Sequence, residues 1–222
     1  MRRKAKWIWG ALCLVAIVVV ILAFSFRRTI LLEAGKFMAP VANHIDGVAD
    51  AVILEGTEFV SKGMVSEGVG LLSSGKARRM VIVLHRIAPS HRPFAVNGDY
   101  HSSVRTELQR LGLKPSSFTI IATPIQEPIT LTSARGALEV LSRDSIRSAI
   151  LVSPGFHMRR SFLVYRHLYL PLHIKIYPLA CFDQYQLGDW WNEDTGVRDF
   201  IGEVSKLMLY VVARYIPLKF SY

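Results

Sequence analysis

Cysteine is scarce in this chain of 222 residues, which contains only Cys13 and Cys181. Cys13 lies in an apolar run near the N-terminus and Cys181 stands alone in the remainder, so a disulfide within the folded domain is excluded. Internal repeats and low-complexity tracts are also absent. The roughly 180 residues after the apolar run are enough for one domain with a full hydrophobic core, and too few for two ordinary domains.

Acidic residues are missing from positions 2–28, which hold six of the 27 Lys and Arg residues. The rest of the chain has 21 basic and 17 acidic residues, a net charge of +4, and no dense basic stripe. The total charge of +10 therefore indicates membrane topology and affinity for anionic lipid. No nucleic-acid partner is expected.

Charged side chains are also absent from residues 7–26, which are apolar or small. At about 1.5 Å per residue, this run is long enough to cross a hydrocarbon core of ~30 Å as a helix. The basic flank 1–6 favours a cytoplasmic N-terminus, and Arg27 and Arg28 oppose it in part. A cleaved signal peptide would have a shorter apolar region, and its only candidate exit here, Ala23-Phe24-Ser25, is weak and is followed at once by two arginines. We therefore expect an uncleaved single-pass anchor, with the bilayer as a partner and an exported domain.

Residues 27–41 are expected to form a juxtamembrane helix, 29–38, and a linker, followed by one α/β domain over 42–222. Apolar runs predict strands at 49–54, 79–84, 118–122, 148–153 and 174–178. Helical spacing predicts helices at 60–74, 102–111, 132–142, 156–168 and 197–215, and a Thr or Ser is expected to cap the helix 132–142. This alternation is typical of a Rossmann-like parallel sheet of about five strands with helices on both faces.

The most informative motif follows the strand 148–153, where Pro154 and Gly155 lead into a helix carrying His157, Arg159 and Arg160. Backbone N–H groups at a helix start favour phosphate or carboxylate, and ligands bind at the carboxyl ends of parallel strands. His157 and Arg160 are three residues apart and share a helix face, so both could contact one anion. Alternatively, the arginines form a solvated face and His157 is a capping or packing residue.

Several short elements occur in a recognisable order over about residues 49–212. They are Leu54-Glu55-Gly56, Ser74-Gly75-Lys76, Thr130 through Ala134, Ser153 before His157-Met158-Arg159-Arg160, and Trp190 or Trp191 with Glu203 near the end. Together they resemble the ElyC/SanA/YdcF (DUF218) family, and the His-Met-x-Arg element is the distinctive one. The resemblance implies a bacterial inner-membrane protein with a periplasmic domain, linked to envelope integrity, peptidoglycan or surface-polysaccharide metabolism.

The resemblance and the motif together point to an anionic, phosphorylated cell-wall or surface-polysaccharide precursor as the ligand. His157 and Arg160 would hold its phosphate, while Gly56 and Gly155 would let the backbone approach. Further candidates for the ligand site are Thr57, Thr130, Ser153 and Arg159. Glu55 and Glu58 lie at the same strand end, where they either reach the pocket or are simply solvated.

The chain also departs from the family pattern. Thr57 replaces a second glycine, Leu84-His85-Arg86 replaces Ser-Gly-Gly, Tyr100 stands beside Asp99 where an acid is expected, and Thr132-Ser133 replaces Glu-Asn. Two expected carboxylates are thus displaced or missing, which argues against catalysis by a carboxylate base or a metal. His157 is the best catalytic candidate, and no cofactor is indicated. His85, His91 and His101 lack the tight spacing of metal ligands, so no metal site is expected.

Three other functions remain open. The domain could be a phosphoester hydrolase or transferase acting on a lipid-linked precursor. It could be a non-catalytic scaffold that binds a membrane protein. It could also face the cytoplasm and bind a nucleotide or S-adenosylmethionine, ligands that suit the expected fold.

Overall fold

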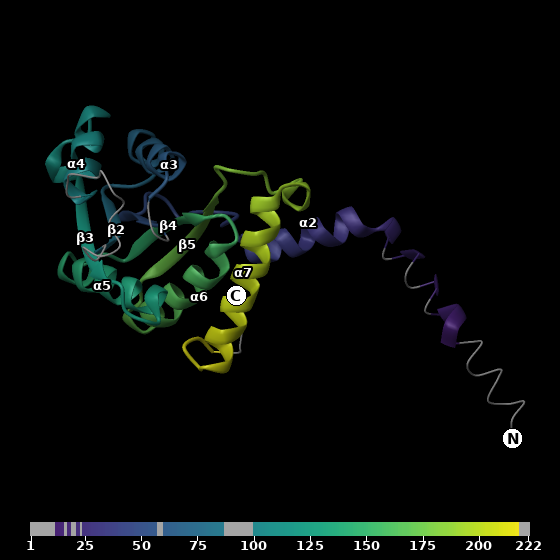
Figure 1. Cartoon of the computed structure of the whole chain (residues 1–222). Coiled ribbons are helices and arrows are strands. Elements are labelled where there is room, and N and C mark those ends of the chain that lie inside the picture. The colour runs from purple at the N-terminus through teal and green to yellow at the C-terminus, as the bar shows by residue number, and fades with distance from the viewer. Residues whose placement is uncertain are drawn as a thin grey trace, which may run out of the picture.

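A five-stranded parallel sheet, in the order β3-β2-β1-β4-β5, forms the centre of the molecule (Figure 1). The computed structural model describes residues 12–15, 17–18, 21–22, 24–56, 60–86 and 100–217. The strands are β1 (Ala51–Glu55), β2 (Met80–Arg86), β3 (Phe118–Pro124), β4 (Ser148–Pro154) and β5 (Lys175–Cys181). The α helices are α2 (Arg27–Met38), α3 (Lys62–Ser73), α4 (Tyr100–Arg110), α5 (Ile129–Arg143), α6 (His157–Tyr169) and α7 (Asp194–Val212). Short 3-10 helices are η2 (Pro115–Ser117), η3 (Leu170–Leu172) and η4 (Trp190–Asn192). The predicted α/β class is therefore confirmed.

The strand order places β1 at the centre of the sheet, between β2 and β4. All five residues of β1 are buried, as expected of a parallel strand whose two faces are both covered. The register sets Ile53 beside Val81 on one side and Leu151 on the other. The chain runs outward from β1 to β3 and returns to β4, so the topology reverses between β1 and β4. Ligands of open parallel sheets bind at such a reversal, beyond the carboxyl ends of the strands.

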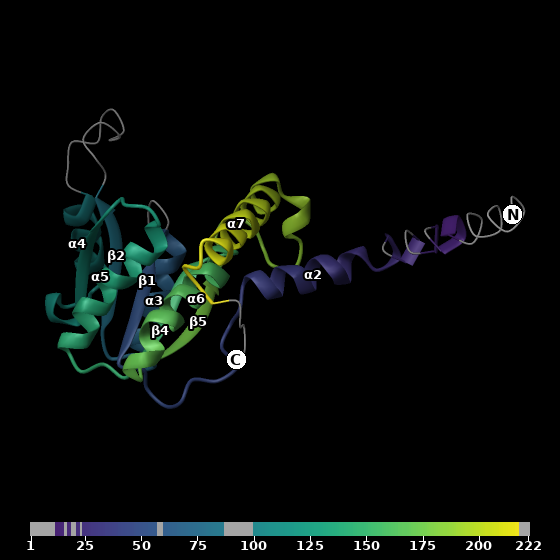
Figure 2. The same ribbon diagram turned by 90° about the horizontal axis from the view of Figure 1, so that it is seen from below.

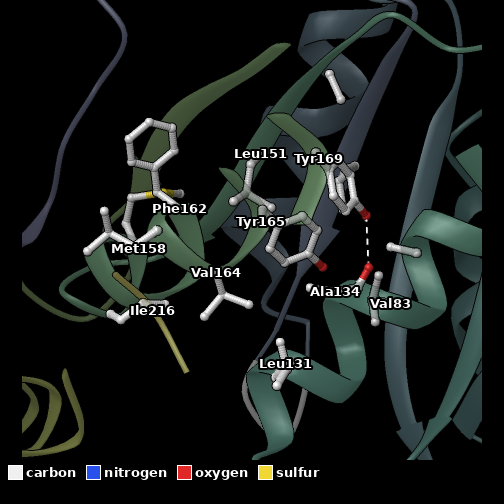
Figure 3. Packing of buried hydrophobic residues seen from close by; sticks show 14 of the residues in the cluster. Val83, Leu131, Ala134, Leu151, Met158, Phe162, Val164, Tyr165, Tyr169 and Ile216 are labelled. Atoms are coloured by element: carbon white, nitrogen blue, oxygen red, sulfur yellow. Dashed lines mark hydrogen bonds between the residues drawn. The ribbon is translucent and has the colours of Figure 1, made fainter. Parts of the chain in front are cut away.

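Helices cover both faces of the sheet, and each face has its own apolar core. One core lies under α3 and α4 and contains Met64, Leu71 and Leu108. The other lies under α5, α6, α7 and α2, on the opposite face (Figures 1 and 2). There the Tyr169 hydroxyl donates a 2.9 Å hydrogen bond to the carbonyl of Ala134, which ties α6 to α5 (Figure 3).

Helix α2 is packed against the domain rather than projecting freely from it. The indole Nε1 of Trp190 donates a 3.2 Å hydrogen bond to the carbonyl of Leu31. A Cβ added at Gly35 would come within 2.8 Å of that nitrogen, so glycine allows this close approach. The guanidinium of Arg159 lies 3.9 Å from the ring centroid of Phe37, a cation–π contact between α6 and α2.

The expected spanning segment, residues 7–26, lies partly outside the described residues. The basic flank, residues 1–6, lies wholly outside them. The parts that the structure describes are helical from residue 12 to 25. Their large apolar side chains are 47% to 66% exposed: Leu12, Leu14, Val15, Ile17, Val18, Ile21, Leu22 and Phe24. Among the residues described, no helix combines the length and the apolar character that crossing a bilayer requires. The span stays a prediction.

The predicted start of α5 was wrong. The helix begins at Ile129, and the residue at its N-cap is Pro128, which has no side chain that can cap it. Two side chains from outside the helix accept its first N–H groups: Glu127 Oε2 accepts from Ile129 at 3.4 Å, and the Tyr210 hydroxyl on α7 accepts from Thr130 at 3.2 Å. Thr132, expected near the cap, instead donates its hydroxyl to the carbonyl of Gln126 at 3.1 Å.

Trp190 links α2, α6 and α7, so its truncation should destabilise the domain. Its ring stacks on Phe200 at 4.3 Å and meets Phe156 edge-on at 5.2 Å, and the residue is 3% exposed. We expect Trp190→Ala to lower the free energy of unfolding by about 3–5 kcal/mol, the usual cost of removing a buried aromatic side chain. Urea unfolding of the detergent-solubilised chain measures this loss.

The matched control is Trp191→Ala, which removes the same side chain from a partly exposed neighbour. Its effect should be clearly smaller. Equal losses for the two variants would mean that the packing around Trp190 is not what stabilises this region.

Candidate functional site

The candidate site lies beyond the carboxyl ends of β4 and β5, next to the reversal of the sheet between β1 and β4. A pocket of about 580 Å³ opens there beside the N-terminus of α6. Its wall comes from the β4–α6 turn, from the segment after β5, from one side of α7 and from the start of α3. The lining residues are Ser61, Met64, Pro154, Gly155, Phe156, His157, Cys181, Phe182, Asp183, Gln184, Tyr185, Arg198, Asp199, Gly202, Glu203 and Lys206. The predicted location, the end of β4, is therefore where the structure has a pocket.

A tight turn at Gly155 aims the start of α6 at this pocket. Gly155 has a φ of +36°, a region that residues with a side chain rarely adopt. Its N–H donates a 2.7 Å hydrogen bond to the carbonyl of Cys181. An added Cβ would come within 2.6 Å of the Tyr185 hydroxyl. Glycine is therefore needed here for the turn and for its contact with the pocket wall.

A buried ion pair joins α6 to α7 behind the pocket. Arg160 donates from Nε to Glu203 Oε2 at 3.0 Å, and from Nη2 to Oε2 at 2.8 Å and to Oε1 at 3.0 Å. Arg160 Nη1 also donates to the hydroxyl of Thr130 on α5. Lys206 Nζ donates to Glu203 Oε1 at 3.0 Å, and its side chain is 58% exposed. Arg160 is thus fully bonded within the protein, mainly to Glu203. Lys206 binds the same carboxylate, but its side chain is largely exposed to solvent.

His157 stands between this ion pair and a second buried carboxyl. Its Nδ1 lies 3.2 Å from Glu203 Oε2 and 2.8 Å from Arg160 Nη2. Its Nε2 lies 3.1 Å from Ser161 Oγ, and Ser161 in turn donates to Glu55 Oε2 at the end of β1. The result is one chain of hydrogen-bonding groups that runs from Glu55 through Ser161 and His157 to Glu203.

The two carboxyl groups of this chain have opposite pKa shifts. Burial raises the pKa of Glu55 to about 8, against the opposing effect of the Ser161 hydrogen bond. Burial also acts against the charge of Glu203, but His157, Arg160 and Lys206 together hold its pKa below the ordinary carboxyl range. Burial and the charge of Arg160 lower the pKa of His157, so its imidazole is neutral at neutral pH. The site thus contains one ionised carboxylate and one carboxyl that titrates near neutrality.

The distances from Ser161 to His157 and from His157 to Glu203 resemble those of a Ser-His-Glu hydrolase triad. A nucleophile must reach its substrate, however, and Ser161 is completely buried and bonded to Glu55. Both ring nitrogens of His157 are within hydrogen-bond distance of protein groups. The arrangement therefore favours binding, with the buried chain fixing the pocket wall, over attack by Ser161.

The structure brings most of the predicted residues to this region but gives them different surroundings. His157 and Gly155 line the pocket. Thr130 contacts Arg160. Ser153 lies behind the pocket wall, with its Oγ 3.5 Å from Ser161 Oγ. Gly56 is buried directly after β1. Thr57 and Glu58 lie outside the described residues. Arg159 contacts Phe37 of α2, and burial lowers its pKa to about 10.

The histidines considered as metal ligands do not assemble into a site in the part of the chain described. His85 Nε2 lies 2.8 Å from Ser133 Oγ, and His91 falls outside the described residues. Where the structure describes the chain, no group of three or more His, Cys, Asp and Glu side chains is placed to hold a metal ion.

Sequence reasoning missed several residues that form the site. Ser161 could have been found, because it is four residues after His157 in a predicted helix and must share its face. Lys206 and Arg198 gave no signal, since charges on an amphipathic helix are ordinary. Phe182 and Tyr185 follow β5 in a segment without a recognisable motif.

Comparisons with known proteins assign the chain to no family. Neither a scan of protein-family models nor a search of curated proteins found a match.

The raised pKa of Glu55 leads to a pH-dependent stability. Between about pH 4.5 and 8 the folded protein holds a proton that the unfolded chain has released, so stability falls as pH rises through this window. Glu55→Gln removes that titration. Thermal scans of the detergent-solubilised protein measure the melting temperatures of the unmodified chain and of Glu55→Gln at each pH. We expect the melting temperature of the unmodified chain to fall relative to that of the variant as the pH rises from 5 to 8.5.

Glu107→Gln is the control, because Arg110 lowers the pKa of that exposed carboxyl and takes it out of this window. Its melting temperature should run parallel to that of the unmodified chain. Parallel curves for Glu55→Gln as well would show that Glu55 does not titrate between pH 5 and 8.5.

Proposed function

We propose that the protein is a single-pass bacterial inner-membrane protein whose periplasmic α/β domain binds a phosphorylated envelope precursor. The observation that carries this proposal is the pocket at the N-terminus of α6, with His157 and Lys206 in its wall. The resemblance of the sequence to the ElyC/SanA/YdcF (DUF218) family is consistent with such a ligand. A role in envelope integrity is part of the same proposal.

The phosphate is assigned to the part of the pocket between the start of α6 and α7. Phosphate suits this position because a helix N-terminus carries partial positive charge and backbone donors. Lys206 and Arg198 add cationic side chains from α7, and both are exposed. Arg160, expected from the sequence to hold the phosphate directly, is instead a positioning residue, because it is bonded to Glu203 behind the wall.

The remaining wall suits the sugar part of such a precursor. Phe182 and Tyr185 supply aromatic surface, and Asp183 and Asp199 supply carboxylate acceptors for hydroxyl groups. Asp183 lies against the first turn of α3, where an added Cβ at Gly63 would overlap its carboxylate. A helix start therefore compensates part of its charge, which lessens repulsion of an anionic ligand.

Lys206→Ala should weaken binding of a phosphorylated ligand, because it removes the exposed ammonium from the pocket wall. The loss of one charge-assisted hydrogen bond predicts about a tenfold higher Kd. Calorimetric titration of the full chain in detergent with a short-chain isoprenyl phosphate sugar measures the effect.

Lys175→Ala makes the same charge change at the opposite end of β5, where Lys175 pairs with Asp46 on the surface. Its Kd should equal that of the unmodified chain. If both variants bind as tightly as the unmodified chain, Lys206 does not contact the phosphate and the assignment of this pocket fails.

The proposed orientation is tested by protease access to a C-terminal tag in intact spheroplasts, with a cytoplasmic protein as the control. We expect the tag to be digested, because the basic N-terminal flank favours the cytoplasm. Protection until lysis would reverse the orientation and favour a nucleotide or S-adenosylmethionine as the ligand.

A further inference from the structure

The solvent side of α7 carries an apolar stripe that the fold leaves uncovered. Ile201, Met208, Leu209 and Val212 are 59%, 62%, 60% and 79% exposed. Their spacing places them on one helix face, which they share with Ser205. We call these five residues the α7 stripe.

The other sides of α7 are already in use. Glu203, Leu207 and Tyr210 are buried against the domain, and Asp199, Gly202 and Lys206 line the pocket. Packing against the core therefore explains the apolar residues on one side of α7, but it does not explain those of the stripe. Four large apolar side chains in a row on a solvent face indicate a surface that binds another apolar phase.

The position of α7 relative to the N-terminal helix identifies that phase. Leu31 contacts Trp190, immediately before α7, and lies five residues after Phe26. At about 1.5 Å per residue, Leu31 lies roughly 8 Å along α2 from the end of the proposed span, so the segment that leads into α7 is attached to α2 near that end. Figures 1 and 2 both place α7 on the side of the domain from which α2 leaves, and in Figure 1 α7 runs across the direction of α2.

A helix on the side of the domain from which the proposed anchor leaves faces the bilayer that would hold that anchor. Basic residues border this region, with Arg27 and Arg28 at the start of α2 and Arg214 just beyond the stripe. Basic side chains beside an apolar stripe are the composition of interfacial helices, which insert their apolar face among lipid headgroups.

We infer that the α7 stripe is a membrane-contact surface, and that α7 lies in the headgroup region of the same bilayer that holds the anchor. The inference rests on the anchoring part of the proposed function and goes beyond it, since an anchor alone requires no second contact. With this contact the domain has two attachments to the membrane and a fixed orientation on it.

Spin-label accessibility in vesicles of phosphatidylethanolamine and phosphatidylglycerol tests the inference. Cys13 and Cys181 are replaced by serine in the full chain, and Met208→Cys or Val212→Cys then carries the label. We expect both positions to be severalfold less accessible to a water-soluble nickel reagent than the label at Leu111→Cys, and more accessible to oxygen. Leu111 is the matched control, because it is an exposed apolar residue just after α4, on the far side of the sheet.

A fourth label, at Ile17→Cys, tests the N-terminal anchor separately from the membrane contact of the α7 stripe. If residue 17 is lipid-exposed while residues 208 and 212 match residue 111, the anchor stands and the α7 inference is overturned. If residue 17 is also water-accessible, the anchoring proposal itself fails. Protection of residues 208 and 212 from both reagents, with dipolar broadening between labels, would assign the stripe to a second copy of the chain and overturn the lipid contact.

Discussion

The buried ion pair between Arg160 and Glu203 is the interaction on which the site depends. It joins α6 to α7 through three hydrogen bonds, reaches α5 through Thr130 and holds one side of His157. Breaking a buried pair by removing one partner costs about 3–5 kcal/mol, because the remaining charge stays buried. The wall of the pocket formed by α7 is therefore held by electrostatics as well as by the aromatic packing around Trp190.

This arrangement makes the proposed anion site compatible with a buried arginine. Arg160 is neutralised within the protein, so it positions Glu203 and His157 and leaves ligand contact to other groups. Lys206 shares the Glu203 carboxylate but extends into solvent, where an incoming phosphate could compete for it. The start of α6 borders the same pocket, because Gly155, Phe156 and His157 lie in its wall.

Most of the fold was predictable because a buried parallel strand reads as a continuous apolar run, as in 148–153. The start of α5 was not, since its first N–H groups bond to Glu127 and to Tyr210, which is 80 residues from Thr130, and not to a Thr or Ser cap. His157 and Arg160 were found through local spacing. Their partners could not be assigned, because Glu55 and Glu203 are 106 and 43 residues from the groups that they bind. Sequence spacing shows which residues share a helix face, but not which distant charge neutralises them.

Ser161 has one hydroxyl proton and two neighbours that can accept it, and this limits the states of the buried chain. When Glu55 is ionised, Ser161 donates to it, so His157 must carry its proton on Nε2 and accept from Arg160 at Nδ1. When Glu55 is protonated and donates to Ser161, the serine can donate to Nε2. The imidazole proton then moves to Nδ1 and faces Glu203, and Arg160 Nη2 loses its acceptor on the ring and donates to Glu203 alone. The tautomer of an imidazole in the pocket wall is thus coupled to the ionisation of a carboxyl group that it does not touch.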